Sequence, residues 1–279
     1  MPVSIVTGAT GGIGRWVALG LARAGHVVVI VARDRQRGDA TLDWITTHMA
    51  SAQVELLIVD LSSLVATRHA GKLIAERYST IQVLVNNAGV FCTRREETAE
   101  GHELVIAVNH LSPFLLAREL VPSLRSAAEK GTSARIVNIG SSTSDHAGID
   151  PFDLEGKRRW GMIRSYAQSK LALTMTTLSW ARRLREVGVM ANVVHPGTVA
   201  TGLVRAAGPI GLAWRAMAPF LLTPEQGADT PLHVALSSEF STITGAYIKK
   251  RQVVRPNRRV RNALLMEQVW LSTEMLAGR

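Results

Sequence analysis

A tyrosine and a lysine four residues apart could carry out acid–base chemistry. The stretch Tyr166-Ala167-Gln168-Ser169-Lys170 is predicted to begin a helix. Positions i and i+4 share one face of a helix, so the phenol and the ammonium are expected to be neighbours. A nearby cation favours the phenolate, which predicts a tyrosine pKa below its ordinary value of about 10 and proton transfer near neutral pH. The alternative is a surface contact, because the spacing recurs in many helices.

A serine is expected to join this pair. Ser141 follows the apolar run Ala134–Ile139, which is predicted to be a strand. Active sites of open α/β sheets lie at the carboxyl ends of strands, so Ser141 and the start of the Tyr166 helix would meet at one edge. Ser142 is the rival for the same role.

A glycine-rich loop is predicted at that same edge. Thr7-Gly8-Ala9-Thr10-Gly11-Gly12-Ile13-Gly14 ends the first predicted strand, and a helix follows at once. Glycines let the backbone turn tightly and approach a pyrophosphate, whose charge the helix N-terminus attracts. The context therefore predicts a dinucleotide-binding loop; the alternative is a plain strand–helix turn.

Arg33 at the end of the second predicted strand bears on the choice of dinucleotide. An acidic residue there would bind the ribose hydroxyls of NAD, whereas an arginine suits a 2′-phosphate. Arg33 occupies the strand end and Arg15 follows the glycine loop, and guanidinium groups suit phosphate geometry. We therefore expect NADP(H) in preference to NAD(H). A one-residue shift would instead bring Asp34 near the ribose, and either arginine could be a simple surface charge.

Alternating apolar runs and amphipathic segments must position these groups. The strand–helix–strand repetition predicts one α/β domain over residues 1–279, a Rossmann fold with a doubly wound parallel sheet and helices on both faces. The predicted strands are Val3–Thr7, His26–Val31, Gln53–Val59, Ile81–Val85, Ala134–Ile139 and Val189–Val194. The predicted helices are Gly12–Ala24, Arg35–Met49, Leu64–Tyr78, Glu100–Glu129 (broken near Asn109), Ser165–Glu186 and Leu264–Leu276.

Two segments are expected to be additions that build a substrate pocket. The first, Ser142–Arg164, is polar and glycine-containing. The second, 199–223, is apolar and predicts a lid over a hydrophobic substrate, although its residues could equally pack on the core or at a subunit interface. Its apolar residues include Val199, Leu203, Val204, Ile210, Leu212, Trp214, Met217, Phe220 and Leu221.

Composition limits the other classes of function. Hydrophobic residues make up 47% and charged residues 19%, as in globular proteins. The single cysteine, Cys92, excludes a disulfide within the chain and is interpreted as an ordinary small residue. No His/Cys/Asp/Glu cluster has metal-ligand spacing, so no metal is expected.

The net charge of +10 has its surplus near the end of the chain. We interpret that basic stretch as a solvated tail and expect no nucleic-acid partner, because no binding motif or interleaved aromatic residues accompany it. No apolar run reaches the roughly 18 residues of a membrane span, and no leader precedes Val3, so a cytoplasmic protein is expected. The basic residues are Lys249, Lys250, Arg251, Arg255, Arg258, Arg259 and Arg261.

Taken in order, the motifs resemble those of the short-chain dehydrogenase/reductase family over about the whole length of the chain. They are Thr7-Gly8-x-x-x-Gly12-x-Gly14, Asp60-Leu61-Ser62, Asn86-Asn87-Ala88-Gly89, Asn109, Ser141, Tyr166 with Lys170, and His195-Pro196-Gly197 followed by Thr201. Gly140 departs from the pattern, since many relatives have another serine there. The long spacing from Ser141 to Tyr166 is similar to that of the retinol dehydrogenase-like branch, which includes protochlorophyllide reductase.

The resemblance implies a role for each catalytic residue. Tyr166 would exchange a proton with the carbonyl or alcohol oxygen, and Ser141 would hydrogen-bond that oxygen as charge develops on it during hydride transfer. Lys170 would hold the nicotinamide ribose and tune Tyr166, and Asn109 would organise a water-linked proton relay. The implied cofactor-binding residues are Gly8, Thr10, Gly12, Ile13, Gly14, Arg33, Asp60, Leu61, Asn87, Ala88, Gly89, Tyr166, Lys170, Pro196, Gly197, Val199 and Thr201.

The predicted function is therefore an NADP(H)-dependent oxidoreductase acting on the carbonyl or alcohol group of a lipophilic small molecule. The alternative is a non-catalytic dinucleotide-binding sensor or scaffold on the same fold. The resemblance also implies a homodimer or homotetramer, paired through the helices expected over Leu111–Glu129 and Ser165–Glu186.

Overall fold

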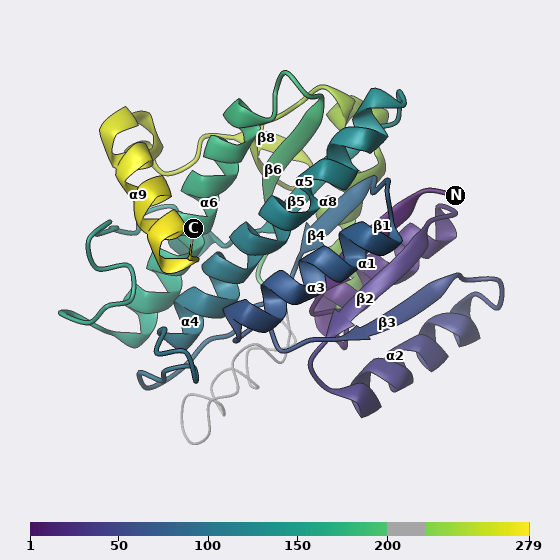
Figure 1. Cartoon of the computed structure of the whole chain (residues 1–279), viewed down its shortest axis with the longest axis horizontal. Helices are drawn as coiled ribbons and strands as arrows, with labels where there is room; N and C mark the ends of the chain where they lie inside the picture. Colours follow the sequence, from purple (N-terminus) through teal and green to yellow (C-terminus); the bar gives the residue numbers. More distant parts are fainter. Residues whose placement is uncertain (200–220, 279) are drawn as a thin grey trace.

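A single eight-stranded sheet forms the centre of the molecule (Figure 1). The computed structural model describes residues 1–199 and 221–278. The strand order is β3-β2-β1-β4-β5-β6-β7-β8, parallel up to β7, with β8 antiparallel at the edge. The strands are β1 (Val3–Thr7), β2 (Val27–Ala32), β3 (Val54–Ile58), β4 (Val83–Asn86), β5 (Ala134–Ile139), β6 (Val189–His195), β7 (Tyr247–Lys249) and β8 (Gln252–Val254).

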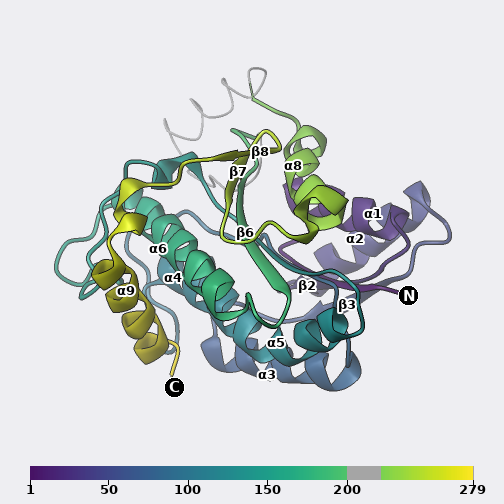
Figure 2. The ribbon, with the colours of Figure 1, turned by 90° about the horizontal axis from the view of Figure 1, so that it is seen from above.

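Helices cover both faces of this sheet (Figure 2). The first layer contains α1 (Gly12–Arg23), α2 (Arg35–His48) and α8 (Pro224–Leu236). The opposite layer contains α3 (Leu64–Arg77), the short α4 (Leu104–Ile106), α5 (Ser112–Glu129) and α6 (Met162–Arg183), and α9 (Ala263–Leu276) packs on the outside of α6. The predicted Rossmann fold is confirmed.

Local sequence signals explain where these elements begin. The central strands are rich in valine and isoleucine and are buried, apart from the first residue of β2, as expected of strands covered on both faces. The side chains of Asp34 and Ser63 cap α2 and α3 by accepting backbone N–H groups, and Thr223 with Gln226 forms a capping box on α8.

Within residues 1–199 and 221–278, one helical segment, Leu104–Glu129, is long and apolar enough to cross a membrane, with a mean hydropathy of 1.4. Within it, 78% of the apolar window is buried inside the fold, so the segment serves as a core helix of the α3/α5/α6 layer.

The basic stretch is part of the fold and not a tail, although most of its basic side chains are exposed, as expected. It forms β7, β8 and a 3₁₀ turn, Arg258–Arg261, and two of its seven cations are paired: Lys249 with Asp145, and Arg251 with Asp229. Strands of three residues escape periodicity analysis, because the sheet edge, rather than an apolar pattern, holds them in place.

The predicted lid over 199–223 and the proposed cofactor residue Thr201 lie almost wholly outside the described residues. Val199 is described and forms an isolated parallel bridge with Leu222. The remaining apolar lid residues named from the sequence fall in 200–220, apart from Leu221.

Candidate active site

The glycine loop is fastened to the end of β4 by Asn87. The Nδ2 atom of Asn87 donates to the carbonyl oxygens of Thr7, at 3.0 Å, and Gly8, at 3.1 Å. The Thr7 hydroxyl oxygen in turn accepts the N–H groups of Asn87 and Ala88, each at 3.0 Å. Gly8 has φ +66°, and a Cβ on it would lie 2.7 Å from the Ala88 Cα atom, so only glycine fits there. These contacts bring two predicted cofactor segments together.

The outer side of the loop is open enough for a pyrophosphate. A Cβ on Gly11 would meet only the Arg37 side chain, at 3.7 Å, and α1 begins at Gly12 with its N-terminal N–H groups directed toward the loop. The residues present therefore fit a dinucleotide, whose phosphates would lie at this helix N-terminus.

Arg33 lies exposed just beyond β2, as predicted. The rival carboxylate of Asp34 is used elsewhere, because it caps α2 by accepting the N–H of Arg37 at 2.8 Å. Arg37, which sequence reasoning missed, reaches back with Nη2 3.4 Å from the Thr10 carbonyl oxygen. Arg15 stacks on Trp44, with its guanidinium carbon 4.2 Å from the ring centroid. The Arg37 guanidinium therefore lies against the glycine loop.

Ser141, Tyr166 and Lys170 meet at the same edge of the sheet. Ser141 lies two residues beyond β5, and its side chain faces the Tyr166 phenol closely enough to lower the pKa of that phenol. Lys170 Nζ lies 6.0 Å from the Tyr166 ring centroid and donates to the Ile139 carbonyl oxygen at 2.8 Å. Ser141 follows β5, and Tyr166 and Lys170 lie in α6. The structure therefore brings these three predicted catalytic residues together.

The expected lowering of the Tyr166 pKa is wrong in direction for the free protein. Burial of the phenol, which is only 8% exposed, raises its pKa, and the Ser141 side chain that faces it opposes this effect. The Lys170 ammonium is itself buried and directed to the Ile139 carbonyl, and burial lowers the pKa of Lys170 to about 8. Desolvation therefore outweighs the attraction between the two groups.

Lys170 should make stability depend on pH. Because its pKa falls from 10.5 to about 8 on folding, the unfolded chain binds the extra proton between these values, and stability rises with pH there. We expect the free energy of unfolding of the wild type, relative to that of Lys170→Met, to increase by up to about 3 kcal/mol from pH 8 to pH 10.5. Urea unfolding at several pH values measures this difference; parallel curves for the two proteins would contradict it.

Asn109 lies in a π-helical turn, Ala107–Leu111, between α4 and α5, where the sequence predicted a break. Its Oδ1 accepts the Val90 N–H at 2.8 Å, and its Nδ2 donates to the Val90 carbonyl at 3.0 Å and to Ser169 Oγ at 3.1 Å. Asn109 therefore joins the strand-end loop to α6, close to Tyr166. Its implied place in a proton relay stays a prediction.

The remaining predicted cofactor residues line the same edge or pack beneath it. Asp60 is exposed and accepts the Ser62 N–H at 2.9 Å, whereas Leu61 is buried. Pro196 and Gly197 follow β6 directly, with Gly197 at φ +91°. Ile13 and Val199 are buried together against Gly227.

Two residues near the phenol were missed by sequence reasoning. Phe91 packs edge-on against Tyr166, with ring centroids 5.4 Å apart. Glu103 is 1% exposed, and its carboxylate accepts from Ser165 Oγ at 3.0 Å and Trp160 Nε1 at 3.2 Å. A lone glutamate before an apolar helix carries no signal of burial, so only the fold could reveal it.

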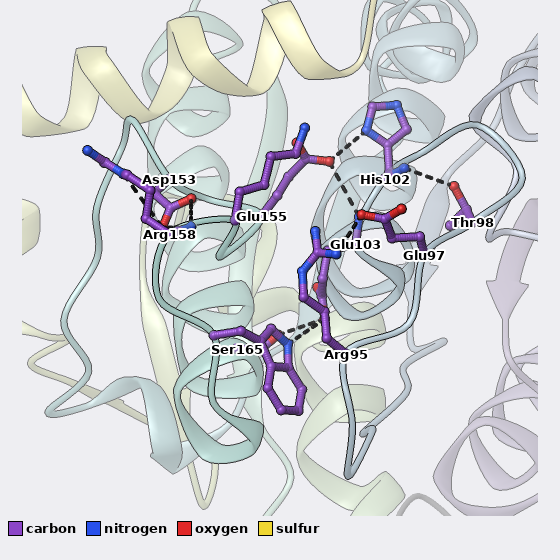
Figure 3. A network of polar contacts seen from close by, with 11 residues as sticks. Arg95, Glu97, Thr98, His102, Glu103, Asp153, Glu155, Arg158 and Ser165 are labelled. Carbon is purple, nitrogen blue, oxygen red and sulfur yellow. Dashed lines mark hydrogen bonds and ion pairs between the residues drawn. The ribbon is translucent and has the colours of Figure 1, made fainter.

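Glu103 belongs to a polar network that ties the 142–164 insertion to the core (Figure 3). It also caps α4 by accepting the Ile106 N–H at 2.8 Å. The neighbouring Glu155 pairs with His102 at 3.0 Å and with Lys157 at 3.0 Å. Burial raises the pKa of Glu103. For Glu155, burial is outweighed by the contacts with Lys157 and His102, which lower the pKa of that carboxyl. The network fixes the helix start that carries Tyr166.

The single cysteine is partly buried. Burial raises the pKa of Cys92 to about 11, which keeps the thiol protonated. Within residues 1–199 and 221–278, no group of three or more His, Cys, Asp or Glu residues could hold a metal ion.

The helices expected to pair two subunits are covered by the chain itself. Trp270 of α9 packs edge-on against Phe114 of α5 and Trp180 of α6, with ring centroids 5.0 Å away in each case. The guanidinium of Arg183 stacks on the other side of that indole at 3.8 Å, and His110 lies 2.8 Å from the Thr273 hydroxyl. The part of this face beneath α9 is therefore unavailable to a second copy, and the homo-oligomer stays a prediction.

Comparison with known proteins connects this geometry to a family. The family model described as short chain dehydrogenase matches residues 2–209. Among curated proteins, retinol dehydrogenase 12 of Homo sapiens is 37% identical over 281 residues, covering 99% of this chain and 87% of that protein. Polyprenol dehydrogenase of Mus musculus is 36% identical over 280 residues, covering 99% of this chain and 84% of that protein.

Two solved structures have a similar fold. An uncharacterized protein from Mycobacterium Paratuberculosis has a TM-score of 0.78 and 26% identity, covering 99% of this chain and 93% of that chain. The Pseudomonas aeruginosa RhlG/NADP active-site complex has a TM-score of 0.71 and 28% identity, covering 89% of this chain and 94% of that chain.

Proposed function

The chain belongs to the short-chain dehydrogenase family, and on that premise we propose that it transfers a hydride between NADP(H) and the carbonyl or alcohol group of a lipophilic small molecule. The observation that carries the proposal is the meeting of the Ser141 and Tyr166 hydroxyls beside Lys170, at the sheet edge that also holds the glycine loop. Bound NADPH supplies the hydride.

The chain's own residues then handle the oxygen of the substrate. The Ser141 side chain faces the Tyr166 phenol, so a carbonyl oxygen placed between them would accept from both hydroxyls as negative charge develops. Tyr166 gives its proton to that oxygen, and the buried Lys170 ammonium stabilises the phenolate that remains. The raised pKa of Tyr166 keeps the phenol protonated and ready to donate in the reducing direction.

The lipophilic nature of the substrate rests on relatives whose names are retinol dehydrogenase and polyprenol dehydrogenase. The alternative, a non-catalytic dinucleotide sensor, is less well supported because a sensor would have no need of Ser141, Tyr166, Lys170 and Asn109 together. The cytoplasmic location stays a prediction.

An NADPH-consumption assay over aldehydes, ketones, quinones and retinoids tests the proposal. We expect turnover with one or more apolar carbonyl compounds. The sensor would be supported instead by two results together. NADPH would raise the melting temperature of the protein, and no compound of the four classes would be turned over in either direction of the reaction.

Arg33 and Arg37 should give the preference for NADP(H). We expect Arg33→Asp to lower the ratio of kcat/KM for NADPH over NADH by about 10- to 100-fold, because a charge-assisted bond to the 2′-phosphate is replaced by repulsion. Arg37→Ala should lower the same ratio by a smaller factor. Steady-state kinetics with both cofactors measures it, and Arg23→Asp, which makes the same charge change at the far end of α1, is the matched control. An unchanged ratio in Arg33→Asp would remove Arg33 from this role.

A further inference from the structure

The chain has three tyrosines, and Tyr247 in β7 lies beside the backbone of Ser141. The Tyr247 hydroxyl is 3.1 Å from the Ser141 carbonyl oxygen and 3.0 Å from Asp145 Oδ1. Its side chain is 2% exposed, and burial together with the Asp145 carboxylate raises its pKa, so the hydroxyl keeps its proton and acts as a donor. A residue 106 positions away in sequence is thereby connected to the catalytic serine.

The sheet holds the Tyr247 ring in this place. In the parallel pairing of β6 with β7, Tyr247 is the partner of Val193. A Cβ on Gly140 would lie 2.6 Å from Val193 Cγ1 and 3.5 Å from Tyr247 Cε2. The space that a serine Cβ would need at Gly140 is therefore filled by Val193, with the Tyr247 ring in ordinary contact beside it, which accounts for the departure from the family pattern immediately before Ser141.

Asp145 and Lys249 hold the hydroxyl end of Tyr247. Asp145 forms an ion pair with Lys249 through its other oxygen, and both side chains are about one quarter exposed. In the strand register, Lys249 of β7 lies opposite His195 of β6. Burial and the positive charge of Lys249 lower the pKa of His195 to about 4, which keeps that ring neutral. The single proton of the Tyr247 hydroxyl is shared between two acceptors, Asp145 Oδ1 and the Ser141 carbonyl oxygen.

Apart from the approach of its side chain to the Tyr166 phenol, the other contacts that hold Ser141 are local. Its carbonyl accepts from Ser144, through N at 3.0 Å and Oγ at 2.7 Å, and its Oγ accepts from Thr143 N at 3.3 Å and Thr143 Oγ1 at 3.0 Å. These bonds stay within one 3₁₀ turn, Ser142–Ser144, which Asn257 also holds by donating to the Ser144 and Ala147 carbonyl oxygens. Among the hydrogen bonds to Ser141 backbone atoms in the described chain, the bond from Tyr247 joins that turn to the sheet.

We propose that Tyr247 is a positioning residue, which anchors the Ser141 backbone to β7 and so sets where the Ser141 hydroxyl meets the substrate oxygen. The inference rests on the proposed function, because it assumes that Ser141 acts on a carbonyl oxygen. Small displacements of a catalytic group are enough to slow a reaction strongly.

The test combines Tyr247→Phe with Ser141→Ala. We expect Tyr247→Phe to lower kcat by about 10- to 100-fold, while the KM for NADPH stays within about twofold of the wild-type value. In a Ser141→Ala background the same change should have no further effect on kcat, because the group that it positions is gone. A purely structural role would lower kcat equally in both backgrounds and would overturn the proposal. Tyr78→Phe, which removes a hydroxyl at the end of α3, is the matched control.

A second measurement does not depend on turnover. Hydrogen exchange of the backbone amides at 141–145, followed by mass spectrometry, should be faster in Tyr247→Phe than in the wild type or Tyr78→Phe. Unchanged exchange would overturn the proposal even if no substrate were found. If the wild type reduces a substrate and Tyr247→Phe has the same kcat, the positioning role of Tyr247 would be overturned and the proposed function would stand.

Discussion

Replacing Tyr166 with phenylalanine is expected to abolish carbonyl reduction while leaving NADPH binding largely intact. The substitution removes only the hydroxyl, so the edge-on packing with Phe91 at 5.4 Å and the position of Lys170 are kept. The lost group is the acid that gives a proton to the substrate oxygen, and positioned acids contribute about 10²- to 10⁴-fold. We expect kcat to fall by that factor, measured as NADPH consumption at saturating substrate.

Two comparisons make this result specific to the Tyr166 phenol. The NADPH-induced rise in melting temperature should be similar in Tyr166→Phe and the wild type, because the glycine loop lies on different elements, β1 and α1. Tyr78→Phe should retain full activity. Normal turnover by Tyr166→Phe would remove this residue from the mechanism.

Much of the fold follows from sequence periodicity. The predicted bounds of the strand Ala134–Ile139 agree with β5, and the predicted break near Asn109 is the π-helical turn between α4 and α5. Such segments bury apolar faces of clear period, which local sequence reports. β7 and β8 have no such period, because a three-residue strand at a sheet edge is held by its neighbours and its turn.

The site was predictable in its members and less so in its electrostatics. Ser141, Tyr166 and Lys170 could be brought together in advance because strand ends and helix starts share one edge. The direction of the Tyr166 pKa shift could not be predicted, because residue spacing indicates the neighbouring cation but not the burial that raises the pKa. Arg37, Glu103 and Tyr247 were missed for a related reason: their roles depend on contacts made across the fold.

Gly14→Ala provides the strongest expected effect on cofactor binding and stability together. In an ordinary helix this change would favour folding by about 1 kcal/mol, because alanine is the better helix former. Here the new Cβ would lie 2.4 Å from Asn87 Nδ2 and 2.7 Å from the Gly8 carbonyl oxygen. Because backbone atoms cannot turn aside, Asn87 would be displaced and its bonds to Thr7 and Gly8 lost.

The steric cost should therefore outweigh the gain in helix propensity. We expect Gly14→Ala to lower the free energy of unfolding by about 1–3 kcal/mol, measured by urea titration, and to weaken NADPH binding, measured by calorimetry. Gly148→Ala is the matched control, since a Cβ there meets nothing within 4 Å. If Gly14→Ala leaves the stability and the NADPH affinity unaltered, the loop can shift away from Asn87. The close packing between the glycine loop and the end of β4 would then no longer explain why position 14 is a glycine.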